Sequence, residues 1–156
     1  MAHARQATLA DARYLAPRLR DIDARECELL GRSSPLAALT AGVDTGNALA
    51  MISNDDEVMG MFGVAYAGTP GVGAAWMLCS DVLVNDRSHR RQFLREGPAA
   101  ILWMHKEYPV LFNYILKENR IAIRWLKSLG FEFQDTVHPQ ILLFKKELLC
   151  ANQLPS

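Results

Sequence analysis

A long helix-like segment, residues 88–108, lies between two apolar strand-like segments, residues 75–84 and 110–116. This arrangement constrains the fold more than any other feature of the chain, because strands joined by a helical crossover lie parallel in one sheet. Both faces of the 75–84 segment are mostly apolar, which is typical of a central strand. The chain is therefore predicted to adopt an α/β fold with a parallel strand pair near the centre of a mixed sheet.

The other segments alternate between strand-like and helix-like periodicity in the same way. The turn residues at 54–56 separate two apolar runs, which indicates a β-hairpin, and the glycines and proline of residues 68–73 indicate a loop. The expected elements are a strand at 4–7, helices at 8–20, 23–30 and 35–40, hairpin strands at 47–53 and 57–66, a helix at 120–129, and a closing strand pair at 131–134 and 141–145.

Single residues mark several helix ends. Thr8 is an expected N-cap, with Asp11 three residues on in the position of a capping box. Gly31 and Gly130 each follow a helix-like segment, where a C-terminal glycine is typical. Gly97–Pro98 is expected to kink or split the long helix, because proline lacks the backbone donor and clashes with the preceding turn.

The chain has 156 residues, which suits one domain, expected over residues 1–150 with a loose tail at 151–156. Lys plus Arg and Asp plus Glu both number 17, and this balance argues against general nucleic-acid binding. No apolar run is long enough to span a membrane, and no signal core follows the N-terminus. The three widely spaced cysteines form neither a disulfide framework nor a zinc site, so a cytoplasmic protein without a metal is expected.

One motif carries a resemblance to a known family. Asn119, Ala122 and the pair Gly130-Phe131 stand at fixed spacing between two predicted strands. Together with the order of the elements upstream, this motif resembles the GNAT superfamily of acyl-CoA-dependent N-acyltransferases. Taken alone, the motif has an alternative interpretation, because any capped amphipathic helix that ends in Gly-Phe would look the same. The chain is also similar to short GNAT-like proteins of tailed bacteriophages, some of which are linked to virion assembly, over segments such as 11–20, 61–64 and 124–131.

The resemblance implies a GNAT fold, with a mixed, mostly antiparallel sheet of about six or seven strands, a central splayed parallel pair and about four helices. It implies acetyl-CoA as acyl donor, lying in the wedge between the parallel strands, with its pyrophosphate at the start of the following helix. The acceptor would be an amine of a small molecule or protein, in the host cytoplasm if the chain is phage-encoded. The sequence identifies neither the acceptor substrate nor the oligomeric state.

The stretch corresponding to the family's pyrophosphate loop, residues 85–93, contains no glycine. On one interpretation, arginine side chains replace the loop amides, because guanidinium groups suit phosphate geometry. On the other, the stretch is a solvated basic helix start or a protein-binding patch, since charge runs are usually surface. The candidate cofactor-binding residues are Leu83, Val84, Arg87, His89, Arg90, Arg91 and Asn119.

The candidate catalytic residues are Asp81 and Tyr114. Asp81 lies near the end of the predicted central strand and is either a general base for the amine or a strand-end turn residue. Tyr114 is either a hydroxyl donor to the thioester or a structural tyrosine. Asn119 is expected to cap its helix as well as touch the cofactor. The tyrosine that many family members use as the acid is replaced by Leu126.

The sequence and the resemblance together leave two functions. The first is an N-acyltransferase that moves an acetyl group from acetyl-CoA to an amine by direct attack. The alternative is a non-catalytic GNAT-fold phage protein that acts through a host or virion protein, which the missing glycines and tyrosine favour. Nucleic-acid binding through Arg87, Arg90 and Arg91 is disfavoured, because no aromatic platform accompanies them.

Overall fold

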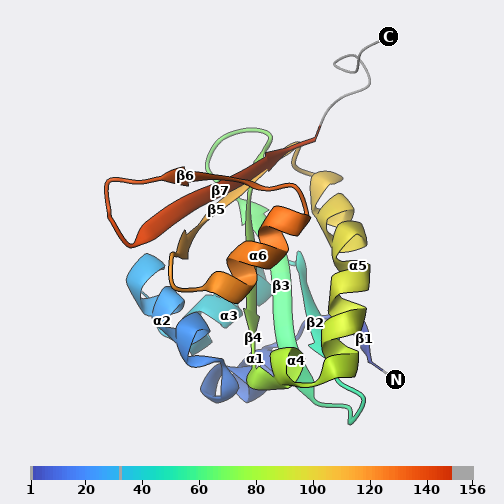
Figure 1. Ribbon diagram of the computed structural model, residues 1–156. Helices are drawn as coiled ribbons and strands as arrows, with labels where there is room; N and C mark the ends of the chain where they lie inside the picture. The colour runs from blue at the N-terminus through green and yellow to red at the C-terminus, as the bar shows by residue number, and fades with distance from the viewer. Residues whose placement is uncertain (1, 32, 149–156) are drawn as a thin grey trace. The chain divides into compact units, whose positions relative to one another are not determined.

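The computed structural model describes residues 2–31 and 33–148 (Figure 1). The expected tail at 151–156, and Cys150, lie outside the described residues. Seven strands form one mixed, mostly antiparallel sheet in the order β1-β2-β3-β4-β5-β7-β6, with β4 and β5 parallel. The strands are β1 (His3–Gln6), β2 (Ala48–Ile52), β3 (Val58–Tyr66), β4 (Val72–Cys79), β5 (Val110–Leu116), β6 (Glu132–Asp135) and β7 (Ile141–Glu147). The predicted α/β class and parallel pair are confirmed.

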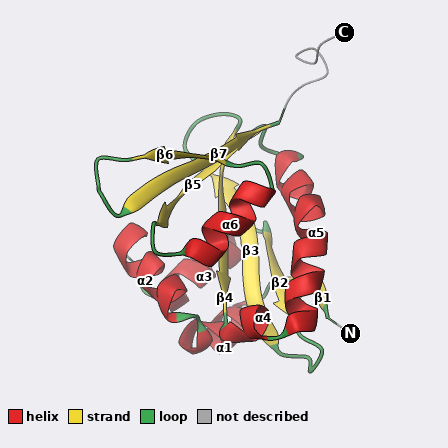
Figure 2. Cartoon of the chain, viewed as in Figure 1, coloured by secondary structure: helices red, strands yellow, loops and turns green. Residues whose placement is uncertain are grey.

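Six α-helices and one short 3₁₀ helix at Ala16–Arg18 accompany these strands in the described part of the chain (Figure 2). The helices are α1 (Leu9–Leu15), α2 (Asp21–Leu30), α3 (Pro35–Asp44), α4 (Asp81–Asn85), α5 (Arg87–His105) and α6 (Arg120–Ser128). The capping box of Thr8 and Asp11 is confirmed, since each side chain accepts the other's backbone N–H. Gly31 is the C-cap of α2, as expected.

Two predicted boundaries are wrong. The strand expected over 75–84 ends at Cys79, because the Ser80 hydroxyl accepts the Val82 N–H and starts α4. Gly97–Pro98, expected to kink or split the long helix, does not split it: α5 runs through Pro98. A proline removes only its own N–H donor, so the bonds of the neighbouring turns can still hold the helix together.

The chain divides into two compact units, Met1–Ala65 with Trp76–Glu96, and Tyr66–Ala75 with Gly97–Ser156. The expectation of a single domain stays a prediction. In the first unit, one face of β2 contributes Ala48, Ala50 and Ile52 to a core that contains Leu15 and Leu39 of the helices. Met51 points to the opposite face, where a second cluster contains Met59, Cys79 and Leu83.

In the second unit, β5 pairs along its whole length with β7, and β6 pairs with the same strand on the other side. The α6 helix ends in a Schellman motif. Gly130 adopts a φ of 93°, its N–H donates to the Lys127 carbonyl, and the Phe131 N–H donates to the Leu126 carbonyl. Phe131 then packs edge-on against Phe144 of β7. The predicted closing glycine is confirmed. No helix within residues 2–31 and 33–148 has the length and apolar character needed to cross a membrane.

Candidate functional site

The end of β4 is held by the start of α2. The Arg20 N–H donates to the Cys79 carbonyl at 2.9 Å, and the Cys79 N–H donates to the Asp23 carboxylate at 2.8 Å. Arg20 Nη1 lies 3.5 Å from the same carboxylate. Asp23 is only 3% exposed. Both backbone groups of Cys79 are therefore occupied, by Arg20 at the N-cap of α2 and by Asp23 of α2. No sequence signal indicated this arrangement, because the partners lie far apart in the chain.

The environment of Cys79 disfavours ionisation of its thiol. Burial raises its pKa, and the Asp23 carboxylate raises it further. Burial also raises the pKa of Asp23, against the opposing effect of the Cys79 N–H and the Arg20 charge. Both groups are thus structural parts of this strand end.

The short α4 helix carries three of the candidate residues. Asp81 is its first residue and is exposed. Leu83 is buried in the cluster with Met59 and Cys79, so its side chain packs in the core. The Val84 carbonyl accepts a hydrogen bond of 2.7 Å from Arg90 Nη1. Leu83 and Val84 therefore lie on a helix, not on the strand expected from the sequence.

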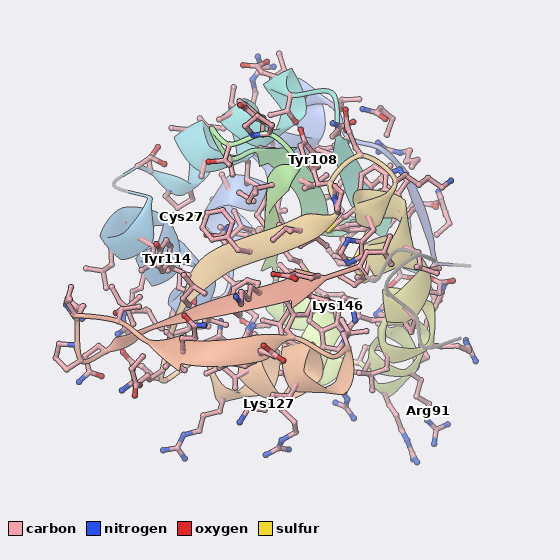
Figure 3. All side chains as sticks on the ribbon, turned by 90° about the horizontal axis from the view of Figure 1, so that it is seen from above. Cys27, Arg91, Tyr108, Tyr114, Lys127 and Lys146 are labelled. Carbon is pink, nitrogen blue, oxygen red and sulfur yellow. The ribbon has the colours of Figure 1, made fainter. Side chains whose placement is uncertain are left out.

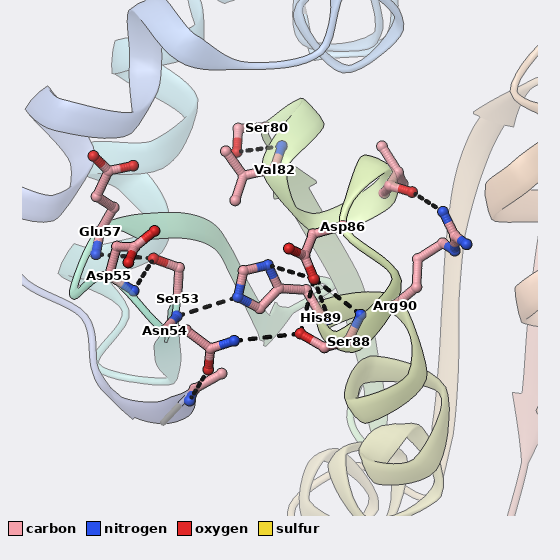
Figure 4. Close-up of polar contacts among 12 residues, drawn as sticks. Ser53, Asn54, Asp55, Glu57, Ser80, Val82, Asp86, Ser88, His89 and Arg90 are labelled. Atoms are coloured by element: carbon pink, nitrogen blue, oxygen red, sulfur yellow. Dashed lines mark hydrogen bonds and ion pairs between the residues drawn. The ribbon is translucent and has the colours of Figure 1, made fainter.

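Asp86 occupies the N-terminus of α5. Its Oδ1 accepts hydrogen bonds from the backbone N–H of Ser88 at 2.9 Å and of His89 at 3.1 Å, and from the Ser88 hydroxyl at 2.8 Å (Figure 4). The hydrogen bonds from His89 and Ser88 lower the pKa of this carboxyl. Two of the amides that an external anion would use at this helix start, those of Ser88 and His89, are therefore already bound to a carboxylate of the chain.

His89 is buried behind this cap, at 4% exposure. Its Nε2 accepts the backbone N–H of Asn54 at 3.1 Å, and its Nδ1 lies 3.6 Å from Asp86 Oδ1. Asn54 also donates through Nδ2 to the Ser88 hydroxyl at 3.3 Å. Figure 4 shows the imidazole between the β2–β3 turn and the start of α5. His89 thus joins two elements of the first unit, and sequence reasoning missed this role.

The arginines of α5 are exposed. Arg87, Arg90 and Arg91 all lie in its first two turns, and Arg91 points away from the ribbon in Figure 3. An open, shallow surface hollow of about 430 Å³ is lined by Asp81, Val82, Asn85 and Asp86. Its two carboxylates suit a cation such as an amine better than a phosphate.

Two candidate residues lie in the second unit. Tyr114 is 44% exposed on β5 and meets Phe112 edge-on, with ring centroids 5.9 Å apart. The parallel ladder in this unit joins residues 72–74 to 110–112. Directly after it, the Asn113 side chain donates to the Ala75 carbonyl at 2.8 Å, in place of a backbone group.

Asn119 occupies the N-cap position of α6, but its side chain makes no capping hydrogen bond. The expected side-chain cap is therefore wrong. Its backbone carbonyl accepts the Ile123 N–H, as an N-cap carbonyl does. Leu126, at the position of the family tyrosine, is buried in the helix face and offers no acid. Within residues 2–31 and 33–148, no cluster of histidine, cysteine or acidic side chains could hold a metal ion.

A family model described as "Bacteriophage T7, probable scaffold protein Gp13" matches residues 57–137, which is more than half of the chain. The chain belongs to this family. The match to the Gp13 family covers the α4–α5 junction, all of β5 and the Asn119-to-Phe131 module. No protein of curated function matches the sequence.

Solved structures resemble this Gp13-family member over nearly its whole length. A GNAT-family acetyltransferase from Bacillus anthracis is 8% identical with a TM-score of 0.66, and the match covers 94% of each chain. A GCN5-related N-acetyltransferase from Kribbella flavida is 17% identical with a TM-score of 0.65, covering 94% of this chain and 98% of that one. A phosphinothricin acetyltransferase from Sinorhizobium meliloti, in complex with AcCoA, is 14% identical with a TM-score of 0.62, covering 94% and 88%. The Gp13-family chain therefore has the GNAT fold.

Proposed function

We propose that this chain is a GNAT-fold binding protein of phage particle assembly that acts through protein contacts and does not transfer an acyl group. The observation that carries the proposal is the Asp86 carboxylate on the α5 N-terminal amides. This proposal reverses the order of the two functions drawn from the sequence.

The Asp86 carboxylate opposes anion binding at the start of α5 electrostatically. A helix N-terminus binds a pyrophosphate through unoccupied N–H groups and the positive end of the macrodipole. A carboxylate on the same amides removes the donors and repels the phosphate charge. The glycines that would let the backbone approach a phosphate are missing from residues 85–93, and the His89 imidazole is already bound to Asn54.

Two further observations support a non-catalytic protein. The backbone edge at Cys79, along which an acyl donor could pair as an added strand, is bonded to Arg20 and Asp23. Leu126 stands where many GNAT enzymes have their acid. The description of the Gp13 family as a probable scaffold protein supports a place in particle assembly.

The second candidate is an N-acyltransferase, favoured by the GNAT fold and by the short β4–β5 ladder that ends directly before Asn113. In this function the acceptor amine attacks the acetyl thioester, the C–N bond forms and the C–S bond breaks. Asp81 takes the amine proton, Tyr114 supplies a hydroxyl to the thioester, and the leaving thiolate takes its proton from solvent. Acetyl-CoA would be held by the residues already named for it, namely Leu83, Val84, Arg87, His89, Arg90, Arg91 and Asn119, without a metal.

Calorimetric titration with acetyl-CoA and with CoA separates the two functions. The first predicts no binding at millimolar cofactor. Micromolar binding would overturn it, and Arg90→Ala with Arg91→Ala should then weaken that binding. Asp86→Ala tests the physical argument, because removing the carboxylate should increase affinity for the cofactor if Asp86 is what closes the helix start. Asp86→Asn is the matched control, since it keeps an oxygen acceptor without the charge.

The assembly role has its own test. In a complementation assay for infectious particles, Asp81→Asn combined with Tyr114→Phe should support the same particle yield as the unaltered chain, because neither residue is needed for chemistry. A large loss of yield by this variant, with its fold intact by circular dichroism, would favour the acyltransferase.

A further inference from the structure

The outer face of α5 carries unpaired positive charge. Arg87, Arg91 and Arg95 recur every four residues and so share one side of the helix, and all three are exposed. None of them has an ion-pair partner in the described part of the chain. Leu94, which is 55% exposed, lies on the same side. Cations near a helix N-terminus oppose the macrodipole, so helix stability does not account for this basic face.

The β2–β3 turn carries unpaired negative charge. Asp55, Asp56 and Glu57 are consecutive and exposed. The Ser53 hydroxyl accepts the backbone N–H groups of Asp55 and Glu57, which holds the turn in shape. Across residues 2–31 and 33–148, their carboxylates have no described ion-pair partner either. We refer to these three residues as the acidic turn.

The basic face and the acidic turn are neighbours within the first unit. Asn54, directly before the acidic turn, binds His89 and Ser88, and Ser88 directly follows Arg87. Figure 4 shows Asn54 between the turn and the helix start. The start of the basic face, at Arg87, therefore lies near the acidic turn, and yet no ion pair joins the two patches in the described chain.

We propose that this dipolar surface is an interface through which two copies of the chain associate. Two adjacent patches of opposite charge match a second copy turned about a two-fold axis, so that each acidic turn faces the other copy's basic face. Such an isologous contact closes on itself as a dimer. The zero net charge of the chain means that no overall repulsion opposes the encounter. The inference does not depend on either function proposed above.

Sedimentation equilibrium at low and high salt tests the proposal. We expect a monomer–dimer equilibrium whose dissociation constant rises by about tenfold or more between about 0.05 M and about 1 M NaCl, because salt screens exposed charges. The Arg91→Glu, Arg95→Glu variant and the Asp55→Lys, Glu57→Lys variant should each be monomeric at low salt. Asp56 is left unchanged because its φ is 62°.

Mixing these two charge-reversed variants is the decisive step. One then carries only acidic patches and the other only basic ones, so the mixture should form a heterodimer that neither variant forms alone. Arg120→Glu with Arg124→Glu, on exposed positions of α6, is the matched control and should leave the dissociation constant unchanged. A wild-type monomer at low salt and millimolar concentration, salt-independent association, or folded variants that fail to pair on mixing would each overturn the proposal.

Discussion

The carboxylate of Asp23, on α2, accepts the backbone N–H of Cys79 at 2.8 Å, so a helix residue closes the last hydrogen-bonding position of β4. Arg20 completes the closure from the carbonyl side. This contact makes a buried, ionisable group part of the strand end. It also explains why a polar residue stands among the apolar positions of α2 that face the core.

Asp23→Asn should change how stability depends on pH. Burial raises the pKa of Asp23 in the folded state, so the folded chain binds this proton more tightly than the unfolded chain does. The free energy of unfolding of the wild type, relative to Asp23→Asn, should be greatest below the unfolded pKa and should fall as the pH rises through the folded pKa. Urea denaturation of both proteins from about pH 3 to about pH 7 measures this difference.

Asp11→Asn is the matched control for that experiment. Burial opposes ionisation of Asp11, but the hydrogen bonds from Arg5 and Thr8 outweigh it and lower the pKa. Its stabilising contribution is therefore present above the unfolded pKa and is lost as the pH falls through the folded pKa. The difference in free energy of unfolding between the wild type and each variant should therefore change with pH in opposite directions for Asp23→Asn and Asp11→Asn. A change in the same direction for both would contradict the assignment of burial as the larger effect on the pKa of Asp23.

Neutral His89 should carry its proton on Nδ1. The Asn54 N–H donates to Nε2, which must then be unprotonated, and Nδ1 faces Asp86 at 3.6 Å. Long-range proton–nitrogen spectra identify the tautomer directly. A neutral ring with its proton on Nε2 would contradict this geometry.

Gly130→Ala should destabilise the chain by about 1 kcal/mol, because an L-residue is strained in the left-handed conformation that the Schellman motif requires. The side chain that an added Cβ would meet is the flexible end of Lys146, so crowding contributes little. Thermal unfolding measures the loss. Gly130→Asn should lose less, since asparagine tolerates this conformation, and an equal loss would point to crowding instead.

Gly42→Ala and Gly63→Ala should both destabilise the first unit by roughly 1–3 kcal/mol through overpacking. A Cβ at position 42 would overlap the Trp76 ring, whereas a Cβ at position 63 would overlap the Asn47 backbone carbonyl. Trp76→Phe should therefore relieve Gly42→Ala and leave most of the Gly63→Ala loss in place. A double-mutant cycle by urea denaturation tests this, and equal relief at both positions would contradict it.

Helix ends could be predicted well where they depend on neighbouring residues. The Thr8 capping box and the Gly130 closure each involve groups at most five residues apart, so residue type and spacing are sufficient to predict them. The strand predicted through residue 84 failed, because Val82, Leu83 and Val84 are apolar and β-like, while the Ser80 cap that turns them into α4 is a single polar residue.

The candidate site, like the helix ends, could be predicted only in part. Its arginines could be named from the sequence, because exposure of a charged run is the ordinary outcome. The roles of His89 and Asp86 could not, because a histidine in a basic stretch looks like a surface ligand until Asn54, 35 residues away, is found beside it. The failed side-chain cap at Asn119 is similar, since the residue type favours a cap but does not guarantee that the amide points back at the helix.

The sequence by itself determined the order of strands and helices apart from α4, the parallel crossover, and the helix ends at Thr8 and Gly130, because these follow from periodicity and short-range hydrogen bonds. Only the tertiary structure decided which polar groups meet: Asp23 with Cys79, His89 with Asn54, and Asp86 with the amides of its own helix. Such contacts depend on where distant segments pack. Burial then decides whether a carboxylate binds a ligand or accepts hydrogen bonds that hold the fold together.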